Sequence, residues 1–153
     1  MRKLATAVGL ATALLIIPAA AEATPPSPAS GTETITSETA TVVGTADGNT
    51  ILAVTAAAVI GGSFSGTFAA QFTTIIHPSG QINDVGTGVC TCSFEGRSGT
   101  VTFHFAGTGT ASDVEVQATT IGATGGLQGL HSKLAVNVAG TAVTYSGTAH
   151  FGP

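Results

Sequence analysis

From residue 33 onward, the chain alternates apolar and polar side chains in short segments separated by glycine-containing turns. For example, Phe64, Phe68 and Phe72 share one face of a single segment. This period of two is typical of β-strands with one buried face, and no segment after the apolar leader combines a helical period with helix caps. The pattern predicts an all-β domain.

Eight such segments can be counted, and most separators suit tight turns between antiparallel neighbours. One apolar, buried face per strand favours an eight-stranded antiparallel up-and-down barrel, with a β-sandwich as the alternative. Glycines within the strands are expected to permit curvature or to make room for a large side chain opposite. The segments run roughly over Glu33–Gly44, Thr50–Ile60, Ser63–His77, Gln81–Phe94, Gly99–Ala106, Ser112–Ile121, Leu130–Ala139 and Thr141–Phe151.

The first 32 residues are expected to lie outside the folded domain. Residues 1–23 have a basic start, an apolar run and small residues before Ala21 and Ala23, which predicts a secretory signal peptide cleaved after one of these two alanines. The apolar run is shorter than the ~20 residues needed to span a bilayer, so no transmembrane anchor is expected in the mature form. Residues 24–32 are rich in Pro and Ser and are expected to form a disordered linker, leaving 33–153 as a single secreted domain.

Charge excludes two classes of partner. After cleavage, only Arg97 and Lys133 carry a formal positive charge, against a larger number of carboxylates. Two cations cannot neutralise a row of phosphates, so neither nucleic acid nor an anionic membrane surface is an expected partner. The second segment, Thr50–Ile60, is apolar on both faces, and we expect the N-terminal segment or another subunit of a homo-oligomer to cover it.

Two stretches carry a family resemblance. FEGRSGTVTFHFAGTG (Phe94–Gly109) and TTIGATGGLQGLHSKLAV (Thr119–Val136) resemble paired signatures of the allene-oxide-cyclase-like barrel group, in particular its small secreted bacterial members of unknown function, and dirigent proteins share the second pattern. The resemblance implies an eight-stranded barrel with a cavity, which in the plant relatives supports cyclase or coupling-guide activity. No catalytic position of those enzymes matches a residue here, so only the fold is carried over.

Cys90 and Cys92 lie two apart in one strand and therefore face the same side. At the normal strand rise their Cα atoms would be ~6.6 Å apart, which is long for a disulfide unless the strand bulges. Export to an oxidising compartment favours the bond. Buried inert thiols, a structural disulfide and a redox-labile bond all remain open, as does a bond between subunits.

Candidate chemistry outside the cysteines is sparse. His104 and His150 fall on the polar faces of their strands and become candidate general bases only if those faces line a wet cavity. Asp113 and Glu115 alternate on one face of the sixth segment and are expected to form a solvent-exposed edge of the sheet. No metal site is expected, because a lone Cys-x-Cys with dispersed histidines lacks the four spaced ligands of structural zinc, and no cofactor motif or catalytic triad order is present.

The sequence thus favours a secreted barrel that binds a small apolar ligand or makes protein contacts. A cofactor-free cyclase or isomerase acting in the cavity and a cell-envelope structural protein are the alternatives. Six aromatic residues on the apolar faces are the candidate cavity lining: Phe64, Phe68, Phe72, Phe103, Phe105 and Tyr145.

Overall fold

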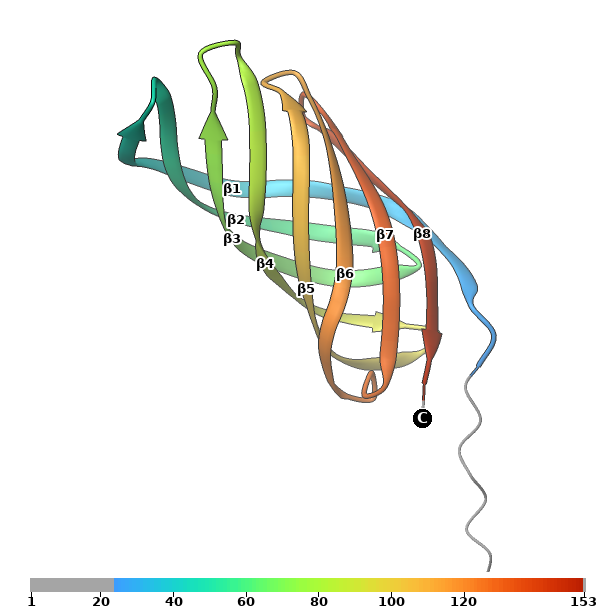
Figure 1. Ribbon diagram of the computed structural model, residues 1–153. Helices are drawn as coiled ribbons and strands as arrows, with labels where there is room; N and C mark the ends of the chain where they lie inside the picture. The colour runs from blue at the N-terminus through green and yellow to red at the C-terminus, as the bar shows by residue number, and fades with distance from the viewer. Residues whose placement is uncertain (1–23, 153) are drawn as a thin grey trace, which may run out of the picture.

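The computed structural model describes residues 24–152, in which eight antiparallel strands pair in chain order and close into a barrel (Figure 1). The predicted all-β, eight-stranded up-and-down barrel is confirmed and the sandwich alternative is not found. The predicted signal peptide lies outside the described residues. The strands are β1 (Ser27–Ala46), β2 (Asn49–Gly62), β3 (Phe64–Ile76), β4 (Gln81–Phe94), β5 (Arg97–Thr110), β6 (Asp113–Gly125), β7 (Leu130–Ala139) and β8 (Ala142–Phe151).

Two of the turns between strands are two-residue turns with positive φ at both positions. Asp47 and Gly48 have φ values of 52° and 80°, and Glu95 and Gly96 have 49° and 75°. This backbone matches the right-handed twist of the flanking strands. The second turn is tighter than predicted, because Arg97 already pairs with Phe94 as the first residue of β5.

The barrel closes through residues that were predicted to be a disordered linker. Within β1, Ser27 to Glu33 pair with β8, from Ala149 to Val143. Ahead of the strand, the Thr24 backbone amide donates to the Phe151 carbonyl oxygen at 2.8 Å. The prediction was wrong for 27–32 because Pro and Ser composition does not prevent pairing when another strand offers a free edge.

The remainder of β1 projects beyond the ring. Thr34 to Ala46 pair with β2 only, and no strand within residues 24–152 pairs with their other edge. Figure 1 shows this β1–β2 hairpin at the upper left, extending to the side of the other hairpins. The N-terminal segment does not cover β2, because β1 lies beside it, and on the outer face of β2 Val59 is half exposed. Cover by another subunit stays a prediction.

The interior is filled at the end of the barrel that holds both ends of the described chain. There Phe64 stacks on Phe94, with ring centroids 4.9 Å apart, and meets Phe103 edge to face at 6.1 Å. Leu127, from the β6–β7 connection, is fully buried in the same cluster. The Arg97 guanidinium lies 4.1 Å from the centroid of the Phe151 ring. This end is therefore a packed aromatic core.

Residues 24–152 contain no helix of a length and apolar character that could cross a membrane.

Candidate functional site

The opposite half of the barrel is hollow. A cavity of about 400 Å³ extends toward the end formed by the β1–β2, β3–β4, β5–β6 and β7–β8 turns. Most of its wall is aliphatic, with alanine or valine at many inward positions, including Val54, Ala56, Ala58, Ala70, Ala118 and Val136. These small side chains leave space that larger ones occupy at the filled end.

Aromatic side chains form another part of the cavity wall. The rings of Phe68 and Phe103 lie 6.3 Å apart, and those of Phe72 and Phe105 lie 5.6 Å apart. All four line the cavity, as the sequence predicted for each of them. The Phe68 ring lies directly over Gly88, where a Cβ atom would overlap it, so the glycine makes the room that the sequence led us to expect.

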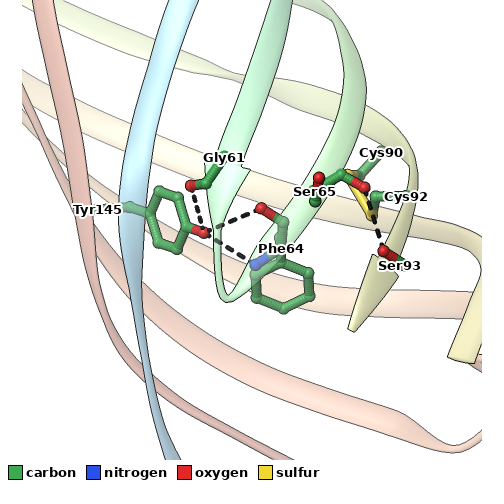
Figure 2. Close-up of a disulfide and its surroundings, with 7 residues drawn as sticks. All are labelled: Gly61, Phe64, Ser65, Cys90, Cys92, Ser93 and Tyr145. Atoms are coloured by element: carbon green, nitrogen blue, oxygen red, sulfur yellow. Dashed lines mark hydrogen bonds between the residues drawn. A yellow bond between two sulfur atoms is a disulfide. The ribbon is translucent and has the colours of Figure 1, made fainter. Parts of the chain in front are cut away.

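Two predicted lining residues lie elsewhere. Phe64 is fully buried in the filled half, and Tyr145 is buried beside it, with ring centroids 6.1 Å apart. The Tyr145 hydroxyl accepts from the Phe64 backbone amide at 3.0 Å and donates to the Gly61 carbonyl oxygen at 3.0 Å (Figure 2). The prediction was wrong for these two because the period of two identifies the inward face but not the level along the barrel axis.

Three carboxyl groups interrupt the apolar lining: Glu33, Glu38 and Asp84. Burial raises the pKa of Glu33, and it also raises the pKa of Asp84, although the bond that the Thr74 hydroxyl donates to Asp84 at 2.6 Å acts in the opposite direction. Burial also raises the pKa of Tyr145, to which the nearby charge of Glu33 adds. Glu33 therefore lies in the cavity wall close to the filled half.

None of these three carboxyl groups was predicted from the sequence to belong to the site. Asp84 lies on the same face of β4 as Cys90 and Cys92, so the period of two could have identified it. For β1 the alternation is broken by a bulge between Ile35 and Ser37. A bulge inserts one residue and reverses which side chains face inward. Glu33 before the bulge and Glu38 after it therefore both line the cavity.

Cys90 and Cys92 form a disulfide within the chain, between β-strand positions two apart. Their Cα atoms are 5.4 Å apart, shorter than a regular strand gives and within the usual range for a disulfide. Both residues are buried and belong to the core cluster, and Figure 2 shows the bond beside Ser65 and Ser93. The bond therefore lies inside one subunit and does not link two subunits.

The two candidate general bases lie outside the cavity. His104 is exposed on β5 between the inward-facing Phe103 and Phe105. His150 lies on the outer face of β8, where its ring stacks on that of His131 with centroids 5.5 Å apart. The apolar faces of the strands line the interior, so the condition for a catalytic role of these histidines is not met. Within residues 24–152 no group of three or more Asp, Glu, His and Cys is placed to hold a metal ion.

Fold and cavity together define a hollow eight-stranded barrel with an apolar, carboxylate-bearing interior. Comparison with protein families finds none that matches this chain, and comparison with curated proteins finds none either. Among solved structures, the chain is similar to a protein with unknown function from the DUF3224 family of Shewanella oneidensis MR-1. The TM-score is 0.73 at 15% identity, over 84% of this chain and 100% of that one. At this identity the similarity shows the fold alone.

Proposed function

We propose that this protein is a secreted carrier or receptor for a small apolar molecule, which it holds in the hollow half of the barrel. The observation that supports the proposal is the cavity of about 400 Å³ with its largely aliphatic and aromatic wall. Binding pockets for small molecules typically measure about 300–1,000 Å³ and combine an apolar wall with a few polar groups. Eight strands enclose just enough space for one small ligand when the inward side chains are small.

The test measures binding of Nile red, a neutral apolar dye, to the mature protein and to two matched variants. Ala70→Phe fills the cavity, whereas Ala69→Phe adds the same ring to the exposed outer face one residue away. Saturable binding to the wild type, weakened at least about tenfold in Ala70→Phe and unchanged in Ala69→Phe, supports the proposal. Equal affinity in all three proteins, or the absence of saturable binding in a folded wild type, contradicts it. Native mass spectrometry of the protein from its host's medium then identifies the natural ligand.

A second candidate function is self-assembly in the cell envelope, and the free edge of β1 favours it. Among the described residues, no strand pairs with the outer edge of Thr34 to Ala46, so its backbone donors and acceptors can pair with another strand, and Val42 and Val43 are well exposed there. Unpaired edges of this kind are templates for pairing with another chain. Light scattering with size-exclusion chromatography tests the idea: a dimer or larger species that Val43→Lys converts to monomer supports it, and a monomeric wild type contradicts it.

A cyclase or isomerase in the cavity stays a prediction from the resemblance alone. Glu33 is a titratable group in the wall, but no residue of this chain has been matched to a catalytic position of the plant enzymes. Conversion of a bound ligand during incubation with the protein is the observation that would favour this function over binding.

A further inference from the structure

We propose that the cavity selects an apolar ligand that carries an amine or another cationic hydrogen-bond donor, and that it rejects the carboxylate of equal chain length. The inference rests on the proposed ligand-binding function and specifies the class of ligand. It follows from the signs of the charged groups that face the cavity and from Glu33, which is the one carboxyl group among them that is partly buried and has no hydrogen-bond partner within residues 24–152.

All ionisable side chains in the cavity wall are acidic. Glu33, Glu38 and Asp84 line it, and none of the described lining residues is Lys, Arg or His. The two cations of residues 24–152 lie elsewhere: Arg97 covers the Phe151 ring at the filled end, and Lys133 is exposed on β7. Because charges interact more strongly in a low dielectric than in water, this arrangement opposes a bound anion and favours a bound cation.

Glu33 is the carboxyl group most available to such a ligand. Asp84 already accepts a bond from the Thr74 hydroxyl, and Glu38 is exposed toward solvent. Glu33, by contrast, is partly buried, and its carboxyl group accepts no hydrogen bond from a residue within 24–152. Burial raises its pKa, because removal from water disfavours the charged carboxylate. A ligand ammonium group would supply a partner while its chain occupies the apolar space.

Glu33 is also suitably placed for a ligand of this shape. It pairs across the sheet with Ile60 and Val143, both buried and both part of the cavity wall. The hydroxyl of nearby Tyr145 is occupied by backbone groups of Gly61 and Phe64, so it does not compete for the ligand's polar group. The Glu33 carboxyl group thus lies at the inner end of the apolar cavity, where it can bind the polar group of a ligand.

The experiment measures, by calorimetry at neutral pH, the affinity of the mature protein for decylamine, decanol and decanoate. The three probes have the same chain and differ in the charge of the head group. We expect decylamine to bind at least about tenfold more tightly than decanoate, with decanol in between. Decanoate binding as tightly as decylamine overturns the inference while leaving the proposed function intact. Failure of all three probes to bind overturns the proposed function as well.

Two charge-matched variants locate the effect. Glu33→Gln removes the partly buried carboxylate of the cavity wall, and Glu115→Gln removes an exposed carboxylate of β6 outside the cavity. We expect Glu33→Gln to weaken decylamine binding about tenfold with decanol binding unchanged, and Glu115→Gln to alter neither. An unchanged decylamine affinity in folded Glu33→Gln protein overturns the role of Glu33. Circular dichroism of each variant verifies the fold.

Discussion

The two halves of this barrel are built from the same strands with the same alternation, yet one is solid and the other hollow. At the filled end the inward positions carry large side chains, among them Phe64, Phe94 and Phe151. At the hollow end they carry many small ones, such as Ala56, Ala58 and Ala70. The number of strands sets the space within a barrel, so the size of the inward side chains decides where it is filled.

The difference between the halves is also one of polarity. In the filled half the Tyr145 hydroxyl is fully engaged with backbone groups of Gly61 and Phe64. In the hollow half the Glu33 carboxyl group is partly buried and has no hydrogen-bond partner within residues 24–152. The packed end therefore contributes most of the stability, and the hollow end presents a polar group that is free to contact a ligand.

The largest expected effect on stability comes from truncating one aromatic ring in each half of the barrel. Phe64→Ala removes a fully buried ring from the filled half and should lower the free energy of unfolding by about 4 kcal/mol. Phe68→Ala removes a partly buried ring that faces the cavity and should cost only about 1–2 kcal/mol. Chemical denaturation of the mature protein measures both. Similar losses from the two substitutions would contradict the division into a packed half and a hollow half.

A smaller effect is expected from the polar contact within the filled half. Tyr145→Phe keeps the ring but leaves the Phe64 backbone amide without its acceptor, at a cost of about 2 kcal/mol. The adjacent Thr144→Val changes an exposed hydroxyl and should stay within about 0.5 kcal/mol of the wild type. Denaturation curves for the two variants make the comparison. Equal curves would show that the Tyr145 hydroxyl is not a structural anchor.

The smallest expected effect concerns Glu33 and depends on pH. Because burial raises the pKa of Glu33 in the folded state, the folded state binds the proton more tightly than the unfolded chain does. Its contribution to stability is present below the unfolded pKa and is lost as the pH rises through the folded pKa. Glu33→Gln should therefore be more stable than the wild type at neutral pH, with the difference shrinking under acidic conditions.

Thermal unfolding of the wild type and Glu33→Gln across this pH range measures the change. Asp84, whose pKa is also raised, remains in the variant, so part of the dependence of stability on pH persists. Glu115→Gln, which removes an exposed carboxylate, is the control and should follow the wild type. A Glu33→Gln variant less stable than the wild type at neutral pH would show that the carboxylate has a stabilising partner.

Residues of the site could be predicted from the sequence where their strand is regular, and not where it is bulged. In β3 and β5 the period of two is unbroken over the residues that carry Phe68, Phe72, Phe103 and Phe105, and these residues were placed in the cavity from sequence alone. In β1 a bulge changes the parity between Glu33 and Glu38, and a single sequence does not indicate where a bulge occurs. Phe64 and Tyr145 were assigned to the correct face but to the wrong level.

The sequence by itself determined the class of fold and the inward face of most strands, because alternation and turn chemistry act over a few residues and need no knowledge of distant partners. Only the tertiary structure decided the closure of the barrel by Ser27 to Glu33, the closed Cys90–Cys92 bond and the meeting of three carboxyl groups around one cavity. These features depend on strand register, stagger and bulges. The closing pairs of β1 and β8 join residues more than a hundred positions apart, and the bulge that brings Glu38 inward belongs to the pairing of β1 with β2. Neither leaves a local mark on the sequence.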